Sequence, residues 1–323
     1  MPESNDPNTY LDQDVESVTL PDFVHKELII FPFNGCERST QSVCDGLKPS
    51  QRKILWACLE KNVTKEQKVT QLGGLISEKV WYQHREQPLF GTIVKMAQND
   101  CGTNKSTCSS GPSSAGRGSS AGRTSTPRFL FTRFLTIMRA VSEGRRRCPD
   151  VHLIRDKHIG PMFVVQVVPM ILINGADGIG SGWRTAIENH NSHDVITNCR
   201  RFIPGDLFEK MTRWFRGWKG TVVKEHDVLF AMFGRWRIAP TTVEVIELPL
   251  EVWTEKYKKH PETLFELRTD SAYTEHHKIN TARFVVEFCD ELDDTEVLQQ
   301  LKLTWSTAAT NVRLFDRNCM TKR

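Results

Sequence analysis

Three cations near the start of a predicted helix are the residues whose type and spacing best suit contact with phosphate. Lys48, Arg52 and Lys53 belong to or follow the turn signal Asp45-Gly46-Leu47-Lys48-Pro49, and a helix is expected over about residues 50–61. Cations and the N-terminus of a helix both suit phosphate oxygens, so the pattern is compatible with a nucleic-acid backbone. A solvated helix face is the alternative, because runs of charge usually lie on the surface.

Two other patterns suggest ligand chemistry, but each lacks a required part. His190 and His193 have the spacing of a metal pair, yet no third ligand recurs nearby at zinc spacing. The glycine-rich run 174–182 has the spacing of neither a dinucleotide fingerprint nor a P-loop, so its glycines are expected to permit a tight turn. Nine cysteines without a CxxC pair indicate reduced thiols, as in the cytosol or nucleus.

The most basic neighbourhood of the chain surrounds a segment of low complexity. Residues 102–126 contain 8 Ser, 5 Gly and no acidic residue, and Ser-Ser-Ala-Gly-Arg occurs twice, at 113–117 and 119–123. Such a composition cannot bury apolar surface, so we expect a mobile insert. The run Arg145-Arg146-Arg147 follows, and a solvated loop, a phosphate contact and a localisation patch all remain open for it.

Ahead of the insert, apolar periodicity predicts three short helices. They cover about residues 50–61, 65–81 and 89–98. The pair Gly73-Gly74 is expected to weaken the middle of the second helix. Three short helices separated by polar turns are typical of a helix-turn-helix or winged-helix unit.

After about residue 150 the pattern changes to one of strands. β-Branched residues are concentrated at 164–168 and 171–173, and apolar residues alternate at 243–247 and 284–288. The fold class is therefore α+β. We expect a flexible lead-in over residues 1–20, a helical domain over 21–150 that carries the insert 102–126, and a second domain over 151–323.

The overall composition is that of an ordinary soluble protein. The chain has 323 residues, 39% of them hydrophobic and 25% charged, which is enough to build a substantial core. The net charge of +4 is mild, so nucleic-acid binding must be argued from local patches. No stretch approaches the roughly 20 apolar residues that cross a membrane, and the polar, acidic start is not a secretory signal, so no membrane partner is expected.

A series of short motifs, spread along the chain in one order, is far more specific than composition. They are Lys26-Glu27-Leu28-Ile29-Ile30-Phe31, Glu37-Arg38-Ser39, Asp45-Gly46-Leu47-Lys48-Pro49-Ser50-Gln51-Arg52-Lys53, Tyr82-Gln83-His84, Ala97-Gln98-Asn99, Pro169-Met170-Ile171-Leu172-Ile173-Asn174-Gly175-Ala176-Asp177-Gly178-Ile179-Gly180-Ser181-Gly182-Trp183, Lys219-Gly220-Thr221, Glu247-Leu248-Pro249 and Phe284-Val285-Val286. Together they resemble the breakage-reunion region of eukaryotic type IIA DNA topoisomerase (DNA topoisomerase II). The resemblance covers about residues 8–320.

This resemblance implies an architecture and an activity. Residues 21–150 are expected to form a winged-helix DNA-gate domain, and 151–323 an α/β tower domain that flanks the DNA. Members of the family cleave one duplex, pass another through it and religate the first. They use ATP and Mg²⁺ through an ATPase and a TOPRIM domain, which this sequence lacks, so no cofactor or metal site is expected here. The acids Asp290, Glu291, Asp293 and Asp294 resemble a solvated face of the tower.

The chain departs from the family at the catalytic position. The family places an Arg-Tyr pair where this chain has Arg128 and Phe129, and the tyrosine hydroxyl attacks a DNA phosphodiester. Phe129 has no oxygen, so a covalent phosphotyrosine intermediate cannot form, and none of the four tyrosines lies near it in the sequence. Arg128 is expected to bind the phosphate still. Of the family's ordered segment before the tyrosine, the resemblance retains only Arg117.

The resemblance also assigns DNA contacts to other positions. It strengthens the expectation that Lys48, Arg52 and Lys53 bind phosphates. His84 corresponds to a histidine near the scissile phosphate, although Arg85 and Pro88 differ from the family's flanking pattern, and an ordinary surface histidine is the alternative. Val167 corresponds to an aliphatic side chain that wedges between base pairs and bends the duplex. Strand core is the simpler reading of Val167 and Val168.

The sequence as a whole therefore predicts a topoisomerase II-like breakage-reunion fragment that binds duplex DNA and cannot cleave it. The family activity is that of an ATP-hydrolysing DNA topoisomerase, a nuclear isomerase, but this chain alone is expected to be inactive. A non-catalytic interaction protein that pairs with full-length topoisomerase II subunits is the alternative, and the chain is expected to form either a homodimer or a heterodimer with such subunits. A decayed gene copy is the third reading.

Overall fold

A computed structural model gives the fold of the chain. It describes residues 11, 14, 16–80, 82, 85–98, 108–110, 127–142, 151–154, 157–226, 229–239, 241–250, 252–267, 272–276, 282–288, 292–308, 312–315 and 321–322. Several regions singled out by the sequence lie outside these residues: most of the lead-in 1–20, His84, the insert 102–126 apart from 108–110 (so that Arg117 is also outside), the arginine run 145–147, and Asp290 with Glu291.

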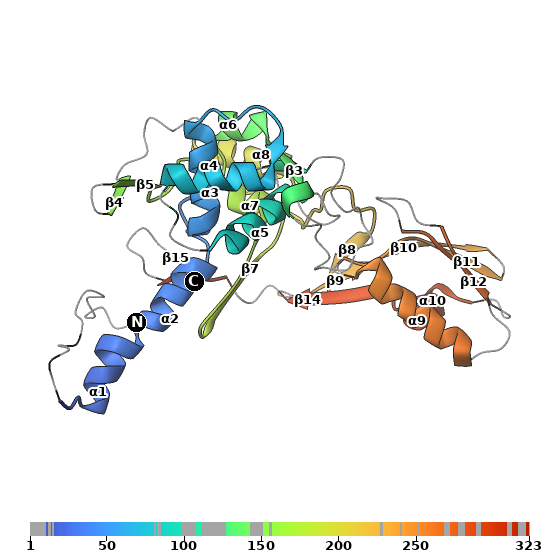
Figure 1. Cartoon of the computed structure of the whole chain (residues 1–323). Helices are drawn as coiled ribbons and strands as arrows, with labels where there is room; N and C mark the ends of the chain where they lie inside the picture. The colour runs from blue at the N-terminus through green and yellow to red at the C-terminus, as the bar shows by residue number, and fades with distance from the viewer. Residues whose placement is uncertain are drawn as a thin grey trace.

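The described residues form a helical body and a strand-rich body that lies to one side of it (Figure 1), which confirms the α+β fold class. The helical body contains α3 (Pro49–Glu60), α4 (Val69–Val80), α5 (Glu86–Ala97), α6 (Thr136–Val141), α7 (Met170–Asn174) and α8 (Ser192–Phe202). An arm of α1 (Leu20–Phe23), the π-helix η1 (Val24–Leu28) and α2 (Ile30–Ser39) extends from it. None of the described helices is both long and apolar enough to cross a membrane.

The strands of the helical body are short and lie around its helices. They are β1 (Gln67–Lys68), β2 (Cys108–Ser110), β3 (Phe131–Phe134), β4 (Val151–Ile154), β5 (Lys157–Pro161), β6 (Ala176–Gly180) and β7 (Trp183–Ile187), and the 3₁₀ turn η2 (Pro127–Phe129) precedes β3. β1, β3 and β2 form one antiparallel sheet in that order. This small sheet fixes the position of the 3₁₀ turn that carries Arg128 and Phe129.

The helix predicted over 50–61 is confirmed as α3. Pro49 occupies its first turn, and the backbone N–H of Lys48 donates to the Gln51 side chain at 3.0 Å, which caps the N-terminus. The helix predicted over 65–81 begins only at Val69, because Gln67 and Lys68 pair with Thr132 and Phe131 of β3. A partner about 65 residues away therefore decides the start of α4.

Gly73 has a packing role that the sequence expectation missed. A Cβ at this position would approach the Phe90 ring to 2.3 Å, so only glycine lets α4 lie this close to α5. The core around it is continuous and includes Ile54, Leu72 and Ile93. The glycine that was expected to weaken the helix is thus required for the packing of the two helices.

Three strand or turn expectations in the middle of the chain are wrong. Residues 164–168 belong to no strand, with a bend at 167–168, and 171–173 lie in the helix α7. The glycine run 174–182 forms most of the hairpin β6–β7, rather than a tight turn between domains. Its glycines are needed because the hairpin packs on α2: a Cβ on Gly178 would come within 2.4 Å of the Ser39 carbonyl oxygen.

The strand-rich body consists of two antiparallel sheets and two helices. The first sheet has the order β10 (Arg235–Ala239), β11 (Thr242–Glu247), β13 (Phe284–Glu287) and β12 (Ala272–Glu275), and the second has the order β14 (Thr304–Ala308), β9 (Leu229–Phe233) and β8 (Thr221–Lys224). The helices are α9 (Thr254–Leu267) and α10 (Asp294–Gln300), and the short strands β15 (Leu314–Phe315) and β16 (Thr321–Lys322) end the chain. β11 and β13 confirm the predicted strands at 243–247 and 284–288.

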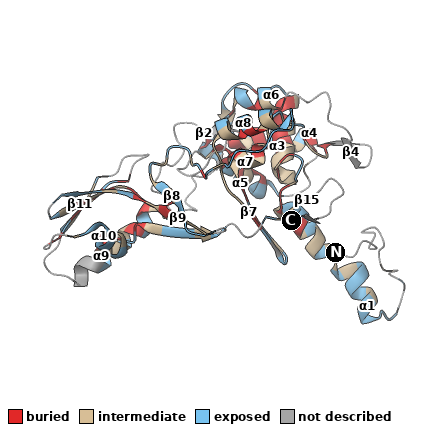
Figure 2. Ribbon diagram, turned by 180° about the vertical axis from the view of Figure 1, so that it is seen from behind, coloured by how far each residue is buried: buried red, intermediate tan, exposed pale blue. Residues whose placement is uncertain are grey.

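Each body has its own core, as the burial pattern in Figure 2 shows. In the strand-rich body the Tyr257 hydroxyl donates to the Leu301 carbonyl at 2.8 Å, and burial raises the pKa of this phenol. The core of the helical body takes in Val164, Met170, Ile173 and Val195, so its packing continues beyond residue 150.

Candidate nucleic-acid interface

Helix α3 presents two half-buried lysines near its N-terminus. Burial lowers the pKa of Lys48, and nearby Lys95 of α5 lowers it further, whereas Asp177 of β6 raises it. Burial also lowers the pKa of Lys53, and Glu37 raises it. Because a phosphate would restore the lost solvation of both ammonium groups, this end of α3 suits an anionic partner.

Lys53 lies beside the aromatic ring of Tyr82. Its ammonium nitrogen lies 5.8 Å from the centre of the Tyr82 ring, close enough for a cation–π interaction. Burial raises the pKa of the Tyr82 phenol. Tyr82 precedes His84 by two residues in the sequence, and His84 lies outside the described residues.

Arg52 lies in a different environment from the two lysines. Its Nε and one terminal nitrogen donate to the two carboxylate oxygens of Asp45 at 2.5 and 2.9 Å, and that nitrogen also donates to the Leu47 carbonyl at 3.2 Å. The Asp45 side chain is fully buried and that of Arg52 only 13% exposed. We therefore assign Arg52 to positioning the turn before α3 rather than to direct phosphate contact.

Asp45 joins this turn to the segment that carries Val167. Besides Arg52, its carboxylate accepts from the backbone N–H of Leu47 at 3.0 Å and from that of Val164 at 3.1 Å. Val164 is buried, whereas Val167 three residues later is 73% exposed. The Val167 backbone N–H donates to the Val141 carbonyl at 2.9 Å, which anchors the backbone at this position.

The exposure of Val167 bears on its two interpretations, which are a strand residue in the core and a wedge that bends DNA. A core position would bury the side chain, but only its neighbour Val168 packs against the core. An exposed aliphatic side chain on an anchored backbone is the form that a DNA-bending wedge requires.

The 3₁₀ turn η2 holds Arg128 and Phe129 on the surface. Both are exposed, and the Phe129 ring has 67% of its area open to solvent. The next residue, Leu130, is buried and its carbonyl accepts from the Val69 N–H at 2.9 Å, so the turn is tied to the start of α4. The position that the sequence assigns to the nucleophile is therefore presented outward by a fixed turn.

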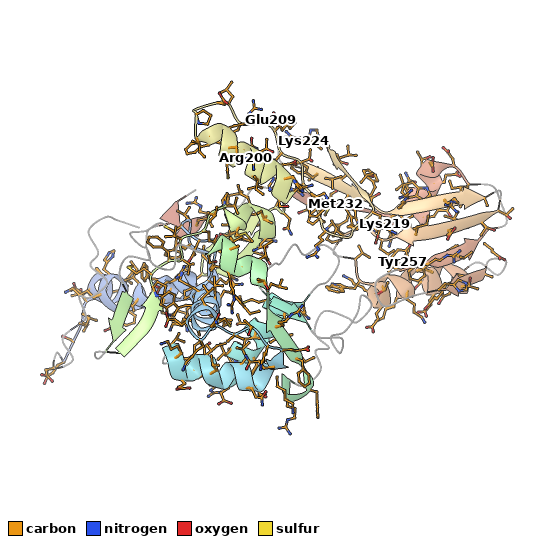
Figure 3. The ribbon with its side chains drawn as sticks, turned by 90° about the horizontal axis from the view of Figure 1, so that it is seen from above. Arg200, Glu209, Lys219, Lys224, Met232 and Tyr257 are labelled. Atoms are coloured by element: carbon orange, nitrogen blue, oxygen red, sulfur yellow. The ribbon has the colours of Figure 1, made fainter. Side chains whose placement is uncertain are left out.

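Cations that the sequence expectation did not include lie close to these residues. The ammonium nitrogen of Lys68 in β1 lies 6.0 Å from the centre of the ring of Phe131, which follows Phe129 by two residues. Lys95 is near enough to Lys48 to affect its pKa. Further on, the exposed Lys219 and Lys224 lie where the chain passes into the strand-rich body (Figure 3). No local sequence pattern signals Lys68 or Lys95, because they lie on elements other than α3.

His190 and Asp293, whose residue types suit metal ligands, have structural partners in the described part of the chain. No three His, Cys, Asp or Glu side chains converge among the described residues. His190 of the proposed histidine pair contacts the Leu172 carbonyl through Nδ1 at 3.2 Å, and burial lowers its pKa. Asp293 caps α10 by accepting from the N–H of Asp294.

Comparison with known proteins places this geometry in a family. The family model for the A-type subunit of DNA gyrase/topoisomerase IV matches residues 38–323. The chain belongs to this family. The match spans the cations of α3, the turn η2, the Val167 segment and the strand-rich body, and thus the whole candidate interface.

Relatives of this DNA gyrase/topoisomerase IV family member are eukaryotic topoisomerases. It is 35% identical over 320 residues to DNA topoisomerase 2 of Candida albicans, a match that covers 96% of this chain and 22% of the relative. It is 34% identical over 337 residues to DNA topoisomerase 2-alpha of Mus musculus, covering 98% of this chain and 22% of the relative. The chain thus spans about a fifth of the length of these curated relatives.

A solved structure of similar fold comes from Plasmodium falciparum. It is the DNA-binding, cleavage and re-ligation domain of topoisomerase II, with a TM-score of 0.88 and 29% sequence identity. The match covers 99% of this chain and 45% of that one. The chain is therefore homologous to the breakage-reunion region of type IIA topoisomerases, as the sequence motifs predicted.

Proposed function

We propose that the chain binds duplex DNA without cleaving it. The observation that carries the proposal is the pair Arg128 and Phe129 on the exposed turn η2. Arg128 supplies a cation, but Phe129 supplies no hydroxyl. Arg128 can pair with a phosphate, whereas a phenyl ring cannot attack one. Lys48 and Lys53 extend the cationic surface along α3, and Val167 acts as the wedge that bends the duplex.

The domain roles, cell compartment and wider activity belong to the same proposal. In it, residues 21–150 act as a winged-helix DNA gate, 151–323 as a tower that flanks the duplex, and the chain works in the nucleus. His84 and Arg117 add phosphate contacts. Strand passage would require ATP and Mg²⁺, which members of the family bind outside the region that this chain resembles.

Pairing with a topoisomerase II subunit is the second candidate function. The arm of α1, η1 and α2 favours it, because Leu20 is 75% exposed and Phe31 is 72% exposed. Large apolar side chains along an extended arm are suited to a protein partner rather than to DNA. Binding of the purified chain to full-length topoisomerase II, lost when Leu20 and Phe31 become serine, would support this function.

Restoring the hydroxyl should not restore cleavage. Phe129→Tyr adds one oxygen at an exposed position, so the fold should tolerate it. An unperturbed phenol has a pKa of about 10 and needs activation by positioned metal and charge. We therefore expect no covalent protein–DNA adduct from Phe129→Tyr alone with Mg²⁺, measured by denaturing electrophoresis of a labelled duplex.

Phe131→Tyr is the matched control, because it adds the same oxygen to a neighbouring exposed ring. Both variants are then mixed with a separate TOPRIM-containing fragment. Cleavage by Phe129→Tyr only in that mixture, and none by Phe131→Tyr, would support pairing with topoisomerase II. Cleavage by Phe129→Tyr alone would show that this chain needs no separate fragment to supply the metal, and would contradict the expectation.

A further inference from the structure

A polar pocket lies beside the small sheet, on residues that the proposed DNA interface does not use. It has a volume of about 210 Å³ and is lined by Thr64, Arg133, Phe134, Leu135, Thr136 and Arg139. The residues come from the loop between α3 and β1, from β3, and from the start of α6. The pocket thus lies a few residues downstream of Phe129 along the chain.

Arg139 is held in the pocket by neutral groups. Its guanidinium donates to the Asn62 side-chain oxygen and, at 2.7 Å, to the Val63 carbonyl. It also lies 6.0 Å from the centre of the buried Phe134 ring. These partners fix the direction of the guanidinium but leave its positive charge without a carboxylate among the described residues.

Arg133 adds a second charge to the same pocket. Its side chain is exposed on β3 and makes neither a hydrogen bond nor an ion pair within the described part of the chain. The hydroxyls of Thr64 and Thr136 likewise have no partner among the residues the structure describes. Two guanidinium groups and two hydroxyls therefore line one cavity with most of their donors unused.

We propose that this pocket binds the phosphate group of a phosphomonoester. Guanidinium groups match phosphate oxygens in bidentate geometry, and threonine hydroxyls donate to the same oxygens. A phosphomonoester carries nearly two negative charges at neutral pH, which balances Arg133 and Arg139, whereas each phosphodiester of a DNA strand carries one. The volume admits a phosphate group with a small substituent.

The test measures binding of three probes to the full-length chain by isothermal titration calorimetry. The probes are inorganic phosphate, phenyl phosphate as a monoester and dimethyl phosphate as a diester. We expect the first two to bind with one site per chain, and dimethyl phosphate to bind at least about tenfold more weakly, because it offers one charge fewer.

Arg133→Gln is the decisive variant, because the Arg133 side chain makes no hydrogen bond or ion pair with the described residues, and its loss should leave the fold intact. It should weaken phenyl phosphate binding by about tenfold or more. The matched control is Arg235→Gln, which removes an exposed arginine from β10 in the other body and should leave binding unchanged. Circular dichroism confirms that both variants are folded.

Three outcomes would overturn the proposal. One is the absence of binding by either phosphate or phenyl phosphate at millimolar concentration. Another is equal affinity for the Arg133→Gln variant and the unaltered chain. The third is equal affinity for dimethyl phosphate and phenyl phosphate, which would make the pocket a further contact for the DNA backbone. Thr136→Val gives a milder check, with an expected loss of a few fold.

Discussion

Replacing Asp45 by alanine should lower the free energy of unfolding by about 3–5 kcal/mol, the usual cost of removing one partner of a buried ion pair. The side chain of Asp45 is completely buried and its partner Arg52 nearly so. The substitution would leave the guanidinium with no anion, and the N–H groups of Leu47 and Val164 with no acceptor. Urea unfolding followed by circular dichroism measures the change.

Asp22→Ala is the control for this prediction. Asp22 also pairs with a cation, Lys26, but both side chains are about half exposed, so its loss should change stability little. Equal effects of Asp45→Ala and Asp22→Ala would show that the buried pair does not position the turn before α3. Because Asp45 also holds the Val167 segment, its loss should weaken DNA binding even at temperatures where the variant is folded.

Removing three cations of the proposed interface should weaken duplex binding by about 100-fold at low salt. The variant changes Lys48, Lys53 and Arg128 to alanine together, and each lost phosphate contact should reduce the slope of log affinity against log salt by about 1. Arg52 is left intact, because its substitution would test stability instead of phosphate contact. Fluorescence anisotropy of a labelled duplex at several salt concentrations gives both quantities.

The matched control removes the same charge from the strand-rich body. Lys256, Lys259 and Arg235 are exposed there, and their replacement by alanine should leave the salt slope nearly unchanged. If the two triple variants lose affinity equally, the chain binds DNA through its net charge alone. An unchanged slope for the first variant would show that Lys48, Lys53 and Arg128 do not contact phosphates and are ordinary surface residues.

Local patterns in the sequence were sufficient to predict the elements that bury one face at a regular spacing. The 3.6-residue spacing predicted α3, and strict alternation predicted β11 and β13. In each case one face of the element packs against a continuous core. Apolar residues therefore recur at the buried positions, and their spacing in the sequence reveals the type of element. These elements support the interface at α3 and the strand-rich body.

The failures arose where a distant partner decides the local structure. Gln67 and Lys68 leave the helical pattern to pair with β3, and the glycines of β6 are required by the approach of α2. The Ile171-Leu172-Ile173 run looks like a strand because it is apolar and β-branched, but it is a short helix with one face in the core. No window of neighbouring residues contains these contacts.

The candidate site was predictable in its residue types more than in its geometry. The spacing of Lys48, Arg52 and Lys53 could not distinguish the two half-buried lysines from the arginine that is bound to Asp45. The exposure of Val167 also depends on anchoring by Val141 and Asp45 from other parts of the fold. His84 and Arg117 lie outside the described residues, so their roles stay predictions.

The most direct test of the central claim measures binding and cleavage in one reaction with the unaltered chain. A labelled duplex is incubated with the chain and Mg²⁺, and half of each sample is analysed natively and half after denaturation in detergent. We predict a native complex whose affinity falls steeply as salt rises, with no label retained on denatured protein. A covalent adduct in the denatured sample, or no complex at low salt, would contradict the account.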